Sequence, residues 1–208
     1  HMATRDVELV VVGIAQDGGV PQAGCVCERC VSAMKDDSKR LHPVSCVIRG
    51  SDGSVHLVEA TRSLPHQLGI AASALGVGDS LIPDSICLTH AHLGHIDGIG
   101  QFGKEVMGLN GIPLFASSSV IQVLEEKSLS APFQTNAVFP GSAFSPSEGC
   151  GFELRRCKVS FDARQHLLVD AGELVADQRI LRIDPGADVF DAVLVHGDLD
   201  ARLVLIVA

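Results

Sequence analysis

Short apolar runs that alternate with amphipathic stretches limit most strongly what this chain can fold into. The run from Val7 to Ile14 is nearly continuous and rich in β-branched residues, which predicts a buried strand. The stretch from Ser63 to Leu75 has apolar residues at helical spacing, which predicts a helix with one buried face. The other elements predicted up to residue 130 are strands at Ser45 to Ile48, Val55 to Val58, Ser85 to Thr89 and Ile112 to Ala116, and helices at Gly98 to Leu109 and Val120 to Glu126. This alternation of strands and helices predicts a layered α/β domain.

The second half of the chain has a different texture. The segment from Ala131 to Gly151 is rich in Pro, Ser, Gly and Phe, which predicts a connecting loop. Short strand patterns follow at Phe152 to Val159, His166 to Val169, Ile180 to Ile183, Ala192 to His196 and Arg202 to Val207. We therefore expect one domain over residues 3–208, with a first half at 3–130 and a divergent, β-rich second half at 131–208. Residues 1–2 are typical of a cloning scar.

The amino-acid composition limits which kinds of molecule the protein is expected to bind. With 46% apolar and 20% charged residues, the 208-residue chain can bury a sizeable core. Its net charge of −9 disfavours nucleic acid and anionic membranes, and the absence of Trp and Tyr disfavours stacking platforms for bases or sugars. No apolar run reaches the roughly 18–20 residues of a membrane span, and the start lacks a signal-peptide pattern. We therefore expect a soluble, cytoplasmic protein with a small-molecule substrate.

Three histidines follow the predicted strand that ends at Thr89. His90 and His92 point to one face of an extended chain, and His95 can fold back if a helix begins after Gly94. Imidazole nitrogens suit zinc, and also iron or copper. A lone histidine here would be an ordinary surface residue, but three within six residues predict a metal site. If it is open on one side, such a site polarises water or a substrate oxygen.

The cysteines form a second candidate site. Seven cysteines are an odd number, which fits poorly with a fully paired disulfide framework. Cys25, Cys27 and Cys30 lie in a loop bounded by Gly and Pro, where three thiolates and one more ligand would make a closed, structural zinc site. A redox pair at Cys27 and Cys30, or three free thiols, are the alternatives. The remaining cysteines are predicted to be small buried residues: Cys46, Cys87, Cys150 and Cys157.

The motifs together resemble a known family. The stretch from Thr89 to Gly98 resembles the His-x-His-x-Asp-His signature of the metallo-β-lactamase superfamily. The stretches from Gly13 to Cys25 and from Gln101 to Pro113, with the cysteine triplet, are similar to pyrroloquinoline quinone biosynthesis protein B-like (PqqB-like) proteins, and a phosphonate-pathway cyclic phosphodiesterase shares the triplet. The resemblance is strong from residue 7 to about 130 and weak afterwards. It implies an αββα sandwich, shortened in its second half, with metal at the edge of the two sheets.

The resemblance also implies roles for individual residues. His90, His92 and His95 match the signature histidines and are the expected ligands of zinc or iron. Gly94 stands where the signature has an aspartate, which normally ligates a second metal and orients the attacking water, so we expect a mononuclear site. Asp97 is the candidate replacement base. Its alternative role is a carboxylate that the dipole of a helix N-terminus favours.

Further ligands are expected from the second half. In the relatives, a histidine near the C-terminus completes the cysteine site, and here His196 or His42 would have to substitute. A loose match places Phe161 where a ligand histidine stands in the relatives. The additional metal candidates are Asp184, His196 and Asp198, although each carboxylate could equally be a turn residue.

These features predict a metal-dependent hydrolase-like enzyme, in which activated water attacks a small-molecule ester, phosphodiester or lactone. A PQQ-biosynthesis-type metal-dependent oxygenase is one alternative, and a catalytically degenerate metal-binding member of the fold is another. The complete first-half motifs favour an enzyme, whereas Phe161 and the missing terminal histidine favour the degenerate member. A shortened sandwich would expose a sheet edge, which favours a homodimer.

Overall fold

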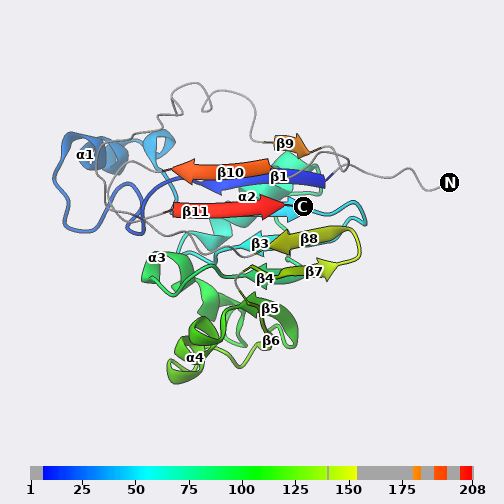
Figure 1. Ribbon diagram of the computed structural model, residues 1–208. Helices are drawn as coiled ribbons and strands as arrows, with labels where there is room; N and C mark the ends of the chain where they lie inside the picture. Colours follow the sequence, from blue (N-terminus) through cyan, green and yellow to red (C-terminus); the bar gives the residue numbers. More distant parts are fainter. Residues whose placement is uncertain (1–6, 140, 154–179, 184–189, 196–201, 208) are drawn as a thin grey trace.

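The computed structural model describes residues 7–139, 141–153, 180–183, 190–195 and 202–207 (Figure 1). The strands are β1 (Val7–Gly13), β2 (Ser45–Arg49), β3 (Val55–Val58), β4 (Ser85–Cys87), β5 (Ile112–Ala116), β6 (Phe133–Ala137), β7 (Ala143–Ser147), β8 (Cys150–Glu153), β9 (Ile180–Ile183), β10 (Phe190–Val195) and β11 (Arg202–Val207). The helices are α1 (Glu28–Lys35), α2 (Leu64–Leu75), α3 (Leu93–Ile96) and α4 (Ser118–Glu126), with 3₁₀ helices at Asp37–Lys39 and Ile99–Phe102. Within these described ranges, no helix has both the length and the hydropathy to cross a membrane.

The larger sheet has seven strands in the order β6-β5-β4-β3-β2-β1-β9. Strands β3 to β6 run parallel to one another, whereas β1 is antiparallel to β2 and β9. Val58 at the end of β3 pairs with Cys87 at the end of β4, so both strands end at the same edge of the sheet. The loops that follow these two strands are therefore neighbours, as ligand-binding loops are in many α/β sheets.

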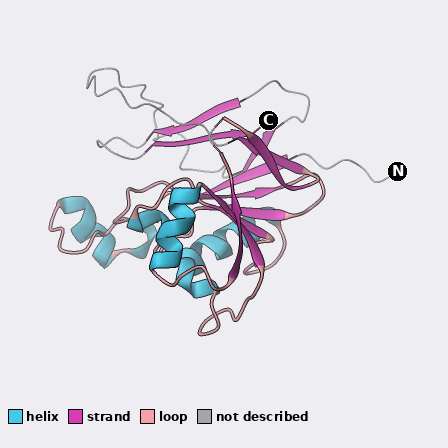
Figure 2. Cartoon of the chain, turned by 60° about the horizontal axis from the view of Figure 1, so that its bottom comes forward, coloured by secondary structure: helices cyan, strands magenta, loops and turns pink. Residues whose placement is uncertain are grey.

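Helices cover one face of the larger sheet, and Figure 2 shows them gathered on one side of the strands. The core on this face packs Leu64 and Leu68 of α2, together with Phe102, against Leu57 and Ile86 of the central strands. All five side chains are almost completely buried, so this layer carries most of the hydrophobic stabilisation that the described residues provide. The predicted helix Ser63 to Leu75 is confirmed by α2.

A smaller, four-stranded sheet in the order β10-β11-β8-β7 lies on the other face. A second core between the sheets contains Cys46 and Cys87 of the larger sheet and Cys150 and Phe152 of β8. The predicted burial of these three cysteines is confirmed, and Cys157 lies outside the described residues. Burial raises the pKa of Cys150 to about 12, which keeps its thiol protonated. The described residues thus make a helix layer and two sheet layers, three of the four layers of an αββα sandwich.

His56 of β3 connects the two sheets. Its Nδ1 lies 2.8 Å from Ser85 Oγ on the neighbouring strand, and its Nε2 lies 3.1 Å from Ser147 Oγ on β7 of the smaller sheet. The residue is fully buried, and this burial lowers the pKa of His56. The neutral ring is therefore the form that the folded protein prefers.

This preference predicts an acid-sensitive contact between the sheets. Because the pKa of His56 is lower in the folded than in the unfolded protein, the unfolded chain binds the proton first as the pH falls below about 6.5. The free energy of unfolding should therefore fall more steeply between pH 7.5 and 5 in the wild type than in His56→Gln, as measured by urea denaturation. The exposed His66→Gln controls for the loss of one imidazole. A difference between wild type and His56→Gln that stays constant over this pH range would contradict the prediction.

The predicted helix from Gly98 to Leu109 is wrong. Only the 3₁₀ helix Ile99–Phe102 forms there, and turns follow it. The N–H of Gly103 donates to the carbonyl of Gly100 at 3.1 Å, and Gly108 has a φ of 66°. Glycine loses more backbone entropy in a helix than other residues do, so the repeated glycines of this stretch favour turns.

The predicted loop from Ala131 to Gly151 is also wrong, because β6 and β7 lie within it. The polar strand β6 extends the larger sheet by parallel pairing with β5, from Phe133 opposite Ile112 to Ala137 opposite Ala116. Strand formation depends more on available partners than on composition. Here the edge of β5 offers hydrogen-bonding partners, so the segment forms strand β6 instead of a loop.

The strands predicted near the C-terminus agree better with the structure. Those at Ile180 to Ile183 and Arg202 to Val207 are confirmed as β9 and β11, and β10 ends one residue before His196. The strand predicted from Phe152 begins two residues earlier, as β8, and its part after Glu153 lies outside the described residues. The strand predicted at His166 to Val169 also lies outside them.

Candidate metal centre

The candidate centre is built at the edge where β3 and β4 end. Glu59 follows β3 directly, and its backbone N–H donates to the carbonyl of Cys87 at 3.0 Å. Thr89 and His90 follow β4, so the carboxylate and the first histidine lie just beyond the neighbouring ends of two adjacent parallel strands. Glu59 is fully buried and has a left-handed φ of 65°, which is uncommon for a residue with a side chain.

Hydrogen bonds beneath the edge hold Glu59 in this conformation. The Ser45 hydroxyl lies 2.9 Å from the carbonyl oxygen of Val58 and 3.1 Å from that of Glu59. The N–H of Ala60 donates to the carbonyl of His95 at 2.9 Å, which ties the residue after Glu59 to the helix that carries the third histidine. Such over-determined strain is typical of functional sites.

Thr89 connects Glu59 to His90. The Thr89 hydroxyl and backbone N–H both donate to Glu59 Oε1, the latter at 3.1 Å, and Thr89 Oγ1 lies 2.8 Å from His90 Nδ1. Because the only hydroxyl proton goes to the carboxylate, the Thr89 oxygen accepts the Nδ1–H of His90. This arrangement selects the tautomer with a free lone pair on Nε2, the form that ligates metals. Burial, and then the neighbouring charge of His95, lower the pKa of His90 and favour this neutral form.

His95 lies between two carboxylates. Its Nδ1 is 3.6 Å from Glu59 Oε1 on the buried side, and its Nε2 is 3.3 Å from Asp17 Oδ1 on the outer side. Burial lowers the pKa of His95, but the carboxylates of Glu59 and Asp17 outweigh this effect and raise it overall. Among the described side chains, Glu59 Oε2 and His95 Nδ1 are buried polar atoms without a hydrogen-bond partner.

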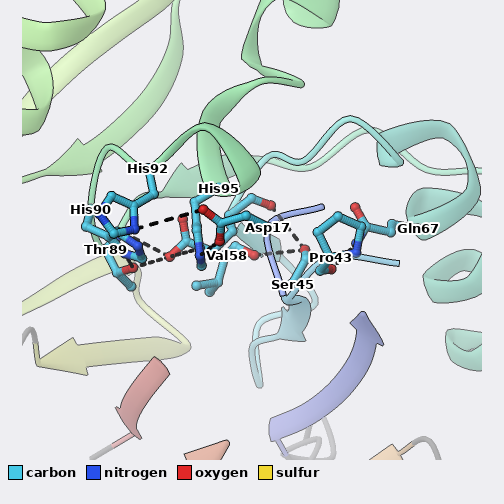
Figure 3. Close-up of polar contacts among 10 residues, drawn as sticks. Asp17, Pro43, Ser45, Val58, Gln67, Thr89, His90, His92 and His95 are labelled. Carbon is cyan, nitrogen blue, oxygen red and sulfur yellow. Dashed lines mark hydrogen bonds and ion pairs between the residues drawn. The ribbon is translucent and has the colours of Figure 1, made fainter. Parts of the chain in front are cut away.

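The three histidines lie together, as Figure 3 shows. The ring centroids of His90 and His95 are 4.0 Å apart, and those of His90 and His92 are 4.6 Å apart. The His92 side chain is 62% exposed, so the cluster is open on its side. Glu59, His90 and His95 each offer a ligand atom within 4.8 Å of the other two.

This donor set fits a zinc or iron ion. Imidazole rings so close together cannot all carry a proton without strong repulsion, whereas their neutral forms present several nitrogen lone pairs to one region. The unpartnered buried atoms of Glu59 and His95 show that protein contacts alone leave this region incompletely satisfied. Exposure of His92 leaves room for a substrate.

The cysteine cluster lies at the start of α1. Cys25 Sγ is 3.3 Å from Cys27 Sγ, and Cys30 Sγ accepts the backbone N–H of Gln22 at 3.4 Å. The backbone N–H of Cys30, and then the thiol of Cys25, lower the pKa of Cys27. The three sulfurs lie within 4.8 Å of one another, which suits a soft divalent ion such as zinc.

The structure does not supply the expected fourth ligand of this cluster. In the part of the chain that is described, no histidine or carboxylate joins the group formed by Cys25, Cys27 and Cys30. His42 instead stacks on His66, with ring centroids 5.4 Å apart. The other candidate, His196, lies outside the described residues.

The remaining predicted site residues are placed as follows. Asp97 comes directly after α3, and its Oδ2 lies 2.7 Å from Arg62 Nε; it is not part of the group formed by Glu59, His90 and His95. Asp184, Asp198 and Phe161 lie outside the described residues.

Two carboxylates of the centre, those of Glu59 and Asp17, were not predicted from the sequence. Glu59 has a detectable signal, since it is an acidic residue directly after an apolar strand that precedes the histidine strand. Asp17 stands in an Asp-Gly-Gly stretch that indicates only a turn, and no local signal connects it with the histidines.

The two sheets, the helical face and the histidine-bearing edge define the class: the chain has the metallo-β-lactamase fold. One similar solved structure is the Zn²⁺-bound PqqB from Methylobacterium extorquens, which is 17% identical over 72% of this chain and 55% of that chain, with a TM-score of 0.60. Another is a diphosphatase from the PhnP family, 25% identical over 72% of this chain and 56% of that one, with a TM-score of 0.53. The chain thus matches little more than half the length of either protein.

No protein-family model and no curated protein matches the sequence. The predicted resemblance to PqqB-like proteins of the metallo-β-lactamase superfamily is confirmed at the level of the fold alone.

Proposed function

We propose that this chain is a metal-dependent hydrolase that directs water at a small-molecule ester, phosphodiester or lactone. The observation that carries the proposal is the group that the buried Glu59 forms with His90 and His95, with the exposed His92 beside His90 on the open side. A diphosphatase of similar fold supports hydrolysis at phosphorus within this range of substrates.

The residues of the centre have separate tasks in this proposal. Glu59 fixes His90 through Thr89 and faces His95 directly, so it positions two ligands at once. His92 and Asp17 flank the exposed side, where the substrate enters. A bound zinc or iron ion supplies Lewis acidity, which makes water a stronger nucleophile near neutral pH.

The cysteine cluster has a structural task in the same proposal. Three thiols offer a closed, sulfur-rich site that suits zinc and leaves little access for a substrate. It lies in the loop that also carries Asp17, so an ion bound there would hold this loop in place.

The test combines metal analysis with a substrate panel. Protein purified without chelators should contain zinc or iron, and His92→Ala should lose the ion of the histidine site while it keeps the ion of the cysteine site. The wild type should hydrolyse at least one of bis(p-nitrophenyl) phosphate, p-nitrophenyl acetate and a simple γ-lactone. His92→Ala should lose more than about a hundredfold of this activity, since loss of a supporting residue alone costs 10–100-fold.

Three outcomes would count against the proposal. Protein without zinc or iron would refute both metal sites. Loss of both ions in His92→Ala would contradict their independence. A fully metal-loaded protein that is silent on the whole panel would exclude the proposed hydrolase.

A further inference from the structure

We propose that Asp17 supplies the metal-binding carboxylate that the His-x-His-x-Asp-His signature carries at the position of Gly94. The proposal rests on the proposed metal-binding function of the histidine site. It assigns a ligand to a loop that precedes the histidines in the chain and is joined to them only by the fold.

The Asp17 carboxylate faces two of the three histidines. Its Oδ1 lies 3.3 Å from His95 Nε2, and its Oδ2 lies 4.0 Å from His92 Nδ1. The opposite nitrogen of His95 faces Glu59, so the nitrogen directed toward Asp17 is the one available for an ion. Figure 3 shows Asp17 beside His95, with His92 above the ring of His90. One carboxylate oxygen thus faces the buried ring of His95, and the other faces the exposed His92.

Gly94 provides the space that Asp17 occupies. A Cβ atom on Gly94 would lie 2.3 Å from Asp17 Cα, 2.5 Å from its Cβ and 2.7 Å from its Cγ. Real Cβ atoms do not approach backbone atoms so closely, so this loop and an aspartate at position 94 exclude each other. The departure from the signature is therefore an exchange, in which one carboxylate is lost from α3 and another enters from the loop after β1.

The loop is held on both sides of Asp17. Before it, the N–H of Ala15 donates to the carbonyl of His42 at 2.9 Å. After it, Val20 and Leu41 exchange two backbone hydrogen bonds of 2.8 and 2.9 Å. These bonds fix the backbone around Asp17, which is the preorganisation that a ligand needs.

A different role for Asp17 makes the opposite prediction. If Asp17 only formed an ion pair with a protonated His95, it would compete with the metal, and its removal would strengthen metal binding. A ligand and a competitor therefore change metal affinity in opposite directions.

The test measures Zn²⁺ affinity by competition with a chromogenic chelator on the full chain. Asp17→Asn and Asp17→Ala should both bind Zn²⁺ at the histidine site more weakly by about tenfold or more, because even supporting residues contribute 10–100-fold. The exposed Asp79→Asn is the control and should match the wild type. Co²⁺ loading separates the sites, because only thiolate-bound Co²⁺ gives a strong ultraviolet charge-transfer band. The visible Co²⁺ bands of the histidine site should shift in Asp17→Asn while this thiolate band stays unchanged.

Gly94→Ala tests whether the space at position 94 is needed for Asp17 to reach the histidines. Its added methyl group should displace the loop and weaken Zn²⁺ binding to a similar extent, although Asp17 is still present. Wild-type affinity in Asp17→Asn or in Gly94→Ala, or tighter binding in either, would overturn the proposal and leave the proposed function intact. A wild type that takes up Zn²⁺ only at the thiolates would refute both.

Discussion

Gly98→Ala should destabilise the protein by about 3 kcal/mol or more, at the upper end of the range for overpacked positions. A Cβ atom on Gly98 would lie 1.9 Å from the carbonyl oxygen of Thr61 and 2.6 Å from its carbonyl carbon. Both are backbone atoms, so no side-chain rotation relieves the contact. The free energy of unfolding from urea denaturation measures the effect.

The same substitution should weaken the histidine site. The N–H of Gly98 donates to the carbonyl of Ala60 at 2.9 Å, and the N–H of Ala60 donates to the carbonyl of His95 at 2.9 Å. These two bonds lock the turn after α3 against the residue that follows Glu59. Separation of the two backbones would move His95 away from Glu59, and Zn²⁺ affinity should fall together with stability.

Gly100→Ala is the matched control. Its added Cβ would meet only Leu129 Cδ2, at an ordinary distance of 3.7 Å. This variant should keep the wild-type stability to within about 1 kcal/mol, since a Gly→Ala change without a clash has small effects. Equal stabilities of Gly98→Ala and Gly100→Ala would show that the backbone contact at Gly98 does not restrict packing.

Glu59→Gln should lower the Zn²⁺ affinity of the histidine site by about 10–100-fold. The amide keeps the size of the side chain and an oxygen that can accept the Thr89 hydroxyl, but it removes the negative charge that faces His95. His95 then loses the charged partner that raises the pKa of its ring. Chelator competition measures the affinity, with the exposed Glu105→Gln as the control.

Folding stability separates this role from a purely structural one. Glu59 is fully buried and its Oε2 has no hydrogen-bond partner, so a neutral amide there should not destabilise the metal-free protein by more than about 1 kcal/mol. Reduced affinity at unchanged stability identifies Glu59 as a positioning residue. Unchanged affinity in Glu59→Gln would exclude that role.

The histidine and cysteine clusters could be predicted because each depends on a few consecutive residues. The spacing of His90, His92 and His95 after an apolar strand is a local pattern, as is that of the three cysteines, and the structure keeps each set together. Buried strands could also be predicted locally, because a β-branched run such as Val7 to Ile14 indicates a strand without reference to its partners.

The features that could not be predicted depend on contacts between segments that are far apart in the sequence. The folded chain brings the loop after β1 onto α3, where Asp17 occupies the space beside Gly94. In the sequence the two residues are far apart, so Gly94 indicates only that the aspartate of the signature is missing. In the same way, β6 exists because β5 offers it an edge, although its own composition favours a loop. The repeated glycines after Gly98 are visible in the sequence, and their entropic cost in a helix explains why only a short 3₁₀ helix forms there.

The arrangement of the sheet links metal binding to the folding of the whole domain. Asp17 follows β1, Glu59 follows β3 and the histidines follow β4, and β2 lies between β1 and β3 in the sheet. A peptide that carries only the histidine stretch therefore lacks both carboxylates of the centre, which join the histidines only after four strands have paired in register. An ion bound by the assembled set would stabilise all four strands by mass action, so removal of the ion with a chelator should lower the free energy of unfolding.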